Sequence, residues 1–146
     1  MTPDPTPDLA VEIETAFELH LPVTTLLAVA LAALFLALAL RVVGERRSNR
    51  VSLGTGGVPS LERRVRAHGN LAEYAPFGLI LCGLAEAQGA PWWLLAVSAL
   101  TFGAGRAMHG YALGWTDSSM RWRVVGMQLT VFGLAGLAAT ALGSLL

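Results

Sequence analysis

Residues 26–40 read L-L-A-V-A-L-A-A-L-F-L-A-L-A-L, an unbroken run of fifteen apolar side chains. Val23, Thr24 and Thr25 precede the run and extend it to about 18 residues, which is long enough for a helix to cross a hydrocarbon core of about 30 Å. The run itself offers no polar side chain to water. It therefore predicts a membrane-spanning helix at about residues 20–43.

The composition of the whole chain extends this prediction from one helix to the molecule. Of the 146 residues, 54% are hydrophobic and 14% are charged, and the mean hydropathy is +0.57. Because a soluble domain carries about 25% charged residues, the chain is predicted to be a small polytopic membrane protein. Its single cysteine, Cys82, excludes an internal disulfide and a multi-cysteine metal site. We expect no bound metal and no nucleic-acid partner.

The charges on either side of the apolar run distinguish the first helix from a cleaved signal peptide. Signal peptides begin with a basic segment and end at a small-residue cleavage site. Here the preceding residues are acidic. A basic cluster of arginines follows the run, namely Arg41, Arg46, Arg47 and Arg50. The first helix is therefore predicted to remain as an anchor, preceded by a disordered tail at residues 1–10.

Three further helices are predicted, so that residues 1–146 form one domain. A loop rich in Gly and Pro leads into the second helix, and a turn at residues 89–91 leads into the third, which carries Trp92 and Trp93 at its start as an interfacial belt would. The stretch at residues 124–146 carries no charge and forms most of the fourth. The expected fold class is an all-α, integral membrane four-helix bundle with helices at about 20–43, 60–88, 91–113 and 120–145.

The arginines also predict the orientation of the bundle. They flank the first and third connections between helices, whereas the second connection has no basic residue. By the positive-inside rule, the first and third connections face the cytoplasm. Both termini and the turn at residues 89–91 are then expected outside.

The polar stretch E-R-R-V-R-A-H-G-N-L-A-E-Y-A-P at residues 62–76 runs into the second helix. The apolar part of that helix is only about 21 Å long, so Asn70 and Glu73 are predicted to lie within the membrane. Positions at equal distance from the turn share one depth, which pairs Glu73 with Arg106 and Asn70 with His109. An arginine at mid-bilayer costs about 2.5 to 3.5 kcal/mol on insertion scales, and a carboxylate at the same depth would offset that cost.

Helical spacing gathers the polar residues into one predicted cleft. At 100° per residue, one face of the second helix carries Arg63, Arg66, Asn70, Glu73 and Phe77, and one face of the third carries Arg106, His109 and Leu113. Arg64 and His68 point elsewhere, and His68 is expected to pack against another helix or against head groups. The cleft is consistent with a binding site, and equally with an ion-paired structural network that includes snorkelling arginines.

These residues resemble a known family. R-V-R-A-H-G-N-L-A-E-Y-A-P-F at residues 64–77, preceded by R-V-S and a Gly/Pro loop, is similar to the second-helix signature of the MAPEG superfamily, the membrane-associated proteins of eicosanoid and glutathione metabolism. G-R-A-M-H-G-Y at residues 105–111 is similar to its third-helix signature. The resemblance covers nearly the whole chain, and the pattern R-x-x-x-N-x-x-E-Y-x-P is fairly specific.

The resemblance implies a homotrimer in a bacterial inner membrane that binds glutathione, as a co-substrate, between neighbouring subunits near the cytoplasmic face. The implied cofactor-binding residues are Arg46, Arg66, Asn70, Glu73, Tyr74, Arg106 and His109. Arginines suit the two carboxylates of glutathione, and Glu73 suits its ammonium group. In the family, an arginine near the start of the fourth helix favours the thiolate, so the candidate catalytic residues are Arg123 and Arg121.

Three functions remain open from the sequence. The first is a glutathione-dependent transferase or peroxidase that acts on lipophilic electrophiles from the bilayer. The second is a non-catalytic lipid-binding or scaffold protein, which Leu113 favours because several family enzymes place a tyrosine at that position. The third is a small transporter, which four short spans without a detectable repeat or a pair of broken helices disfavour.

Overall fold

The computed structural model describes residues 20–116 and 119–146, which form four long helices. In chain order they are α2 (Pro22–Asn49), α3 (Pro59–Ala87), α4 (Trp92–Gly114) and α5 (Met120–Gly143). Neither described segment contains a strand, so the prediction of an all-α four-helix bundle is confirmed. The tail predicted at residues 1–10 lies outside the described residues.

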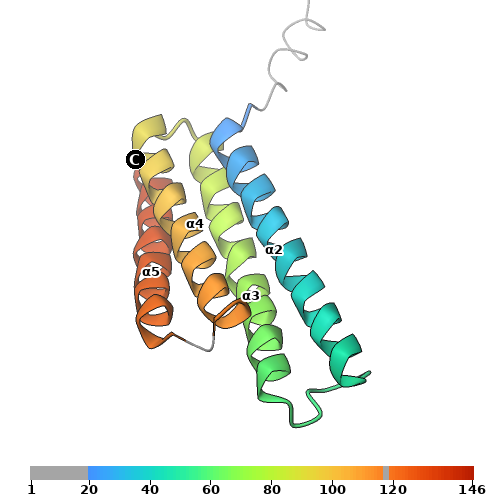
Figure 1. Ribbon diagram of the computed structural model, residues 1–146. Coiled ribbons are helices and arrows are strands. Elements are labelled where there is room, and N and C mark those ends of the chain that lie inside the picture. Colours follow the sequence, from blue (N-terminus) through green and yellow to red (C-terminus); the bar gives the residue numbers. More distant parts are fainter. Residues whose placement is uncertain (1–19, 117–118) are drawn as a thin grey trace, which may run out of the picture.

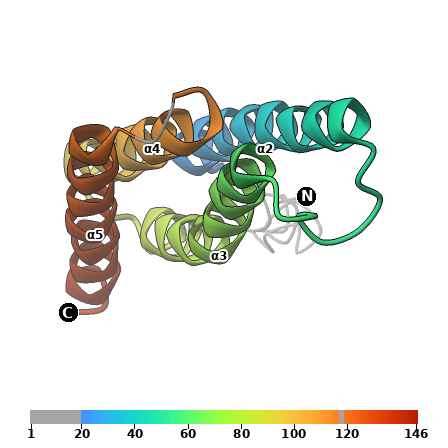
Figure 2. The same ribbon diagram turned by 60° about the horizontal axis from the view of Figure 1, so that its bottom comes forward.

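The helices run side by side along the long axis of the molecule (Figure 1). At one end, called the loop end, lie the loop between α2 and α3 and the connection between α4 and α5. At the other, the turn end, lie the turn between α3 and α4, the C-terminus and the start of α2. α3 and α4 each contact all other helices, whereas α2 and α5 share no contact within the described segments, as the view in Figure 2 illustrates.

α2 ends at Asn49 rather than near residue 43, where the sequence predicted its end. Arg50 closes the helix in the left-handed conformation, with φ of 55°. The N–H of Val51 then reaches back to the carbonyl of Arg46 at 3.0 Å, which satisfies a backbone acceptor of the last turn. Hydropathy marks where the apolar span stops, but a charged segment beyond it can continue the helix into water.

Glycines allow α3, α4 and α5 to approach one another closely. A Cβ atom on Gly133 would lie 2.3 Å from the backbone nitrogen of Phe102, and one on Gly105 would lie 2.5 Å from that of Thr130. Gly78 of α3 likewise leaves room for the buried ring of Phe102. These three helices therefore form a tightly packed unit, which resembles the packing of small residues between membrane helices.

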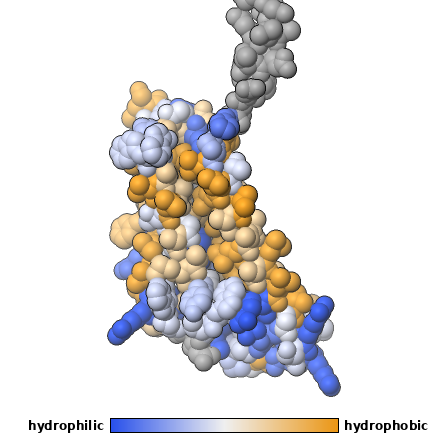
Figure 3. Space-filling model, turned by 45° about the horizontal axis from the view of Figure 1, so that its top comes forward, coloured by the Kyte–Doolittle hydropathy of each residue, from blue (hydrophilic) through white to orange (hydrophobic). Residues whose placement is uncertain are grey.

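The outer surface is apolar over most of its height. Leu26, Leu40 and Phe132 are 72%, 71% and 71% exposed. In Figure 3, hydrophobic residues cover the middle of the visible face and hydrophilic residues gather towards the loop end. α2 and α5 are long and apolar enough to cross a membrane, and only 17% of the most apolar stretch of α2 is buried. Such a surface matches a lipid environment, and the chain is an integral membrane protein.

Candidate functional site

Arg106 of α4 is buried between α3 and α5, with 2% of the residue exposed. Its Nε donates to Oγ1 of Thr130 at 2.9 Å, and its Nη1 donates to Oδ1 of Asn70 at 2.7 Å. Its Nη2 donates to the same threonine oxygen and faces Sδ of Met127 at 3.7 Å. The ring centroid of Tyr74 lies 4.7 Å from Cζ of Arg106. These five residues are called the Arg106 cluster below.

The partners of Arg106 are all neutral. Amide and hydroxyl oxygens accept its hydrogen bonds, and the face of an aromatic ring attracts the cation through its quadrupole. No carboxylate of the described residues pairs with Arg106. An ion pair does form on another side of α3, between Arg64 and Glu45. The Arg106 cluster therefore carries a buried positive charge that the described part of the chain does not neutralise.

α3 positions its side of the cluster by helical spacing. Asn70, Tyr74 and Gly78 follow one another at four-residue intervals and face α4. Gly78 contacts Phe102, and one turn along α4 the guanidinium of Arg106 meets Tyr74 and Asn70. The contact between Gly78 and Phe102 thus fixes how α3 and α4 are aligned, and this alignment brings Asn70 and Tyr74 to Arg106.

α5 contributes Met127 and Thr130, which the sequence analysis did not single out. Thr130 is fully buried, and its hydroxyl donates to the carbonyl oxygen of Gly126 at 2.7 Å while accepting from Arg106. The available signal was the series Gly126, Thr130 and Gly133, in which small residues recur on one face of an apolar helix. An arginine predicted inside the membrane needs a hydrogen-bond acceptor, and Thr130 provides one on this face of α5.

Glu73 does not pair with Arg106, contrary to the prediction from depth. The neighbouring Tyr74 stacks on Arg106, so the predicted register along the helices holds to within about one residue. Glu73 lies on the exposed flank of α3, and Asn70 takes the position facing the guanidinium. Glu73 lies close to the predicted depth, but its side chain does not face Arg106. The polar face of α3 is broad, and Glu73 lies on its exposed flank whereas Asn70 lies on its more buried flank.

His109 does not meet Asn70 either. It is buried on α4, and its Nδ1 lies 3.4 Å from the carbonyl oxygen of Arg123, so that Nδ1 would be the donor in this contact. Arg123, Met127 and Thr130 lie on one face of α5. Arg121 is exposed and lies about 200° around the helix from Arg123 at 100° per residue. Of the two candidate catalytic arginines, Arg123 is the one beside the cluster.

Two predicted glutathione-binding arginines are not part of the Arg106 cluster. Arg66 is exposed on the same flank of α3 as Glu73. Arg46 lies at the loop end, where its Nη1 donates to the carbonyl oxygen of Gly54 at 2.9 Å. With Arg47 and its neighbours it lines a separate pocket of about 350 Å³.

His68 and Arg64 point away from the cleft, as predicted. The ring centroid of His68 lies 4.3 Å from that of Phe35 on α2. Arg64 pairs with Glu45 of α2, which also accepts a hydrogen bond from the hydroxyl of Ser60. These contacts attach α2 to α3 and leave the other side of α3 to the Arg106 cluster.

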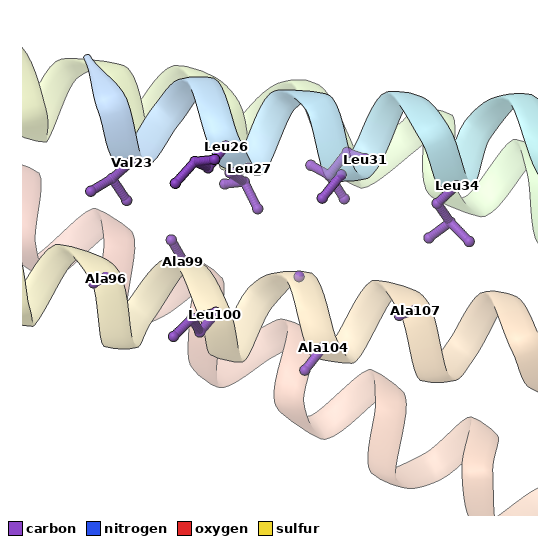
Figure 4. Close-up of a pocket in the computed structure, with 12 residues that line it drawn as sticks. Val23, Leu26, Leu27, Leu31, Leu34, Ala96, Ala99, Leu100, Ala104 and Ala107 are labelled. Carbon is purple, nitrogen blue, oxygen red and sulfur yellow. The ribbon is translucent and has the colours of Figure 1, made fainter. Parts of the chain in front are cut away.

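A second feature is an apolar groove between α2 and α4, with a volume of about 540 Å³ (Figure 4). α2 lines it with leucine and valine side chains from Val23 to Leu34, and α4 opposes them with small residues such as Gly103, Ala104 and Ala107. At 100° per residue, the lining residues of α4 centre about 90° around the helix from Arg106, and no member of the Arg106 cluster lines the groove. The groove is therefore separate from the Arg106 cluster.

Comparison with known proteins gives a consistent result. The model of the family described as the MAPEG family matches residues 24–143. The chain is 37% identical over 108 residues to the inner membrane protein YecN of Escherichia coli K12, an alignment that covers 74% of this chain and 81% of that protein. YecN of Escherichia coli O6:H1 matches with the same identity and coverage.

Proposed function

Because the chain belongs to the MAPEG family, we propose that it is a membrane-embedded enzyme that uses the thiol of glutathione against lipophilic electrophiles or hydroperoxides. In the transferase reaction the thiol loses its proton, and the thiolate sulfur forms a bond to an electrophilic carbon while a leaving group departs or a strained ring opens. In the peroxidase reaction two glutathione molecules reduce the hydroperoxide and form a disulfide. Either reaction needs a site that attracts an anion at the edge of the bilayer.

The observation that carries this proposal is the positive charge of the Arg106 cluster. Arg106 is 2% exposed and has neutral partners only among the described residues. A charge inside a membrane protein is costly and marks a functional site more often than a structural one. Glutathione is anionic, with two carboxylates and a thiol that can ionise. Its binding would neutralise the buried charge.

The flanking residues can divide the work of binding and catalysis. Arg66 would bind a carboxylate of glutathione, and Glu73 would accept the ammonium group, because both side chains are exposed on the same flank of α3. A free thiol has a pKa of about 8.5, so at pH 7 it is mostly protonated. A guanidinium beside the sulfur favours the thiolate. Arg123 is the better candidate for this role than Arg121, because it lies on the face of α5 that contacts the cluster.

The exposed flank of α3 supports a homotrimer with glutathione bound between subunits. Glu73 is the middle residue of the 29-residue helix α3, and Phe77, one turn further, is 64% exposed. A carboxylate in the middle of a membrane helix is unfavourable against lipid. A second copy of the chain would cover this flank and leave a polar gap for the ligand.

The arginines support an orientation in the bacterial inner membrane. Arg46, Arg47 and Arg50 lie at the loop end, and the turn end carries no arginine among the described residues. The loop end would then face the cytoplasm, where glutathione is available, and both termini would lie outside. The name of YecN, an inner membrane protein, supports the proposed membrane but not the orientation within it.

Turnover of purified protein with glutathione and a chloronitrobenzene electrophile tests the proposal. We expect the Arg123→Ala variant to lose most of kcat at pH 7 with a smaller change in KM for glutathione. Raising the pH to 9 should restore part of this activity, because the free thiol then ionises without help. Arg121→Ala, on the exposed face of the same helix turn, is the matched control and should keep its activity.

Binding alone can overturn the proposal. Isothermal titration of wild-type protein with millimolar glutathione should give saturable heat. The absence of any binding, by a protein that remains folded and trimeric in detergent, would exclude glutathione as the substrate.

A second candidate function, lipid binding, is favoured by the groove between α2 and α4. At about 1.5 Å per residue the groove is about 17 Å long. Its lining residues in the described part of the chain are all apolar, and its length and its volume of about 540 Å³ suit a hydrocarbon chain.

Mass spectrometry of protein extracted in a mild detergent tests the lipid-binding function. We expect co-purified lipid in the wild type and its loss in Ala104→Phe, which would fill the groove. Ala135→Phe, at an exposed position of α5 outside the groove, should retain the lipid. Equal retention by both variants would exclude the groove as the lipid site.

A further inference from the structure

The hydrogen-bonding capacity of Arg106 is directed into the protein rather than towards a ligand. Nε, Nη1 and Nη2 all face acceptors of the Arg106 cluster, and the ring of Tyr74 covers the guanidinium. With 2% of the residue exposed, little of the cation can contact a bound molecule directly. Arg106 can therefore attract an anion by its charge, but it can provide a hydrogen bond to a ligand only through the residues that it holds.

Arg106 determines which end of the Asn70 amide faces outward. A guanidinium can only donate hydrogen bonds, so the atom of Asn70 that lies 2.7 Å from Nη1 must be the oxygen. The opposite orientation would bring two donors together. The Asn70 NH2 group is therefore directed away from Arg106, as a donor on the half-buried side of α3.

Thr130 fixes the guanidinium in turn. Its hydroxyl proton is directed to the carbonyl of Gly126 at 2.7 Å, so its lone pairs are left to receive Nε and Nη2 of Arg106. Thr130 cannot shift easily, because α5 contacts α4 through Gly105 at this level. The donor of each hydrogen bond is therefore fixed: Thr130 donates to Gly126, and Arg106 donates to both Thr130 and Asn70.

We propose that Arg106 is a positioning residue, which acts by holding Asn70 with its amide NH2 directed outward to donate to an acceptor oxygen of the bound ligand. The ligand part of this inference rests on the proposed function, in which that oxygen belongs to a carboxylate or a peptide carbonyl of glutathione. The arrangement of Arg106 and Asn70 does not depend on the ligand. The two parts can therefore be tested separately.

The chain contains only two asparagines, Asn49 and Asn70, which makes selective labelling informative. In protein labelled with ¹⁵N-asparagine, Asn49 is an internal reference because its Nδ2 donates to the carbonyl of Glu45 at the end of α2. Without ligand, Arg106→Lys should shift or average the side-chain amide signals of Asn70 and leave those of Asn49 unchanged. Unchanged Asn70 signals in a folded Arg106→Lys variant would overturn the inference, whether or not the protein binds glutathione.

Glutathione binding tests the outward donor. Asn70→Leu removes the outward donor without adding a charge, so glutathione should bind about 10- to 100-fold more weakly, whereas Asn49→Leu should bind as the wild type does. In the Asn70→Leu background, Arg106→Lys should weaken binding little further. Wild-type affinity in Asn70→Leu, or equal losses from Arg106→Lys in both backgrounds, would show that Arg106 acts directly on the ligand. If wild-type protein does not bind glutathione at millimolar concentration, the proposed function is wrong. The spectrum of the ¹⁵N-asparagine-labelled protein without ligand still tests the role of Arg106.

Discussion

At the scale of single residues, the burial of Arg106 is compensated by neutral groups. Replacing one partner of a buried charge is more damaging than replacing a pair, because the charge remains without its hydrogen bond. Thr130 is the critical partner, since one hydroxyl oxygen accepts from both Nε and Nη2. Asn70 and Tyr74 supply the remaining stabilisation on the other side.

Thr130→Val should therefore destabilise the protein by about 1 to 3 kcal/mol, because valine has nearly the same shape but leaves two N–H groups of Arg106 without an acceptor. Equilibrium unfolding in mixed detergent micelles measures the loss. Thr101→Val is the matched control, since the hydroxyl of Thr101 bonds only to its own helix, and it should change the free energy of unfolding by less than about 0.5 kcal/mol. Equal effects of the two substitutions would contradict the importance of the Arg106 contact.

Sequence alone could identify most members of the candidate site but not their contacts. Asn70, Tyr74 and Arg106 were recognisable from the resemblance, and equal distance from the turn placed Arg106 within about one residue of Tyr74, whereas it paired Asn70 with His109. Whether Glu73 or Asn70 faces α4 depends on the rotation of α3 about its axis, which the contact of Gly78 with Phe102 fixes. No pattern in residues 62–76 specifies that rotation.

At the scale of helices, polar contacts attach α2 to α3 and α4 towards its two ends. At the turn end, the carboxylate of Glu86 accepts the backbone N–H groups of Val23 and Thr24, each at 2.8 Å, and so caps a helix from a neighbouring one. At the loop end, Arg41 donates to the carbonyl of Gly114 at 3.2 Å, and Glu45 pairs with Arg64 of α3. Between these attachments lies the apolar groove.

Glu86→Ala should release the first turn of α2, because its N-terminal N–H groups lose their acceptors. We expect a loss of about 1 to 2 kcal/mol in local stability. Hydrogen exchange of the Val23 and Thr24 amides measures it directly. Gln88→Ala, at an exposed polar residue of the same turn, should leave those amides protected, and protection that survives Glu86→Ala would contradict the cap.

Gly133→Ala should separate α5 from α4, because the added methyl group would lie 2.3 Å from the backbone nitrogen of Phe102. Overpacking of this kind costs about 1 to 3 kcal/mol, which thermal unfolding in detergent would register as a lower Tm. Gly143→Ala provides the comparison on the same helix, since no atom lies within 4 Å of the added carbon. It should be neutral or slightly stabilising, because alanine favours helix.

The helices themselves were predictable because hydropathy and turn residues mark membrane spans clearly. The end of α2 was not, since hydropathy reports the edge of the apolar span and says nothing of helix beyond it. The role of Glu86 was also hidden. A carboxylate near the end of one helix gives no sign in the sequence that it caps another, because the two helices are joined by a long stretch of chain.

At the scale of the whole molecule, the distribution of arginines predicts that the loop end faces the cytoplasm. The only native cysteine, Cys82, is fully buried, so single cysteines can be added as reporters of orientation. Gln88→Cys at the turn end should react with a membrane-impermeant maleimide in intact spheroplasts. Leu53→Cys, at a position 87% exposed in the loop between α2 and α3, should react only after permeabilisation. The opposite pattern would invert the proposed orientation.

The attachment of α2 at its ends has a consequence for biosynthesis. α2 emerges from the ribosome before Arg64, Glu86 and Gly114, the residues that later hold it. It must therefore be stable in the bilayer as a solitary helix, and its mean hydropathy of 2.7 over its most apolar stretch suits that stage. Arg106 leaves the ribosome before Thr130 does, so the hydrogen bonds of that buried arginine are completed only when α5 packs against α4.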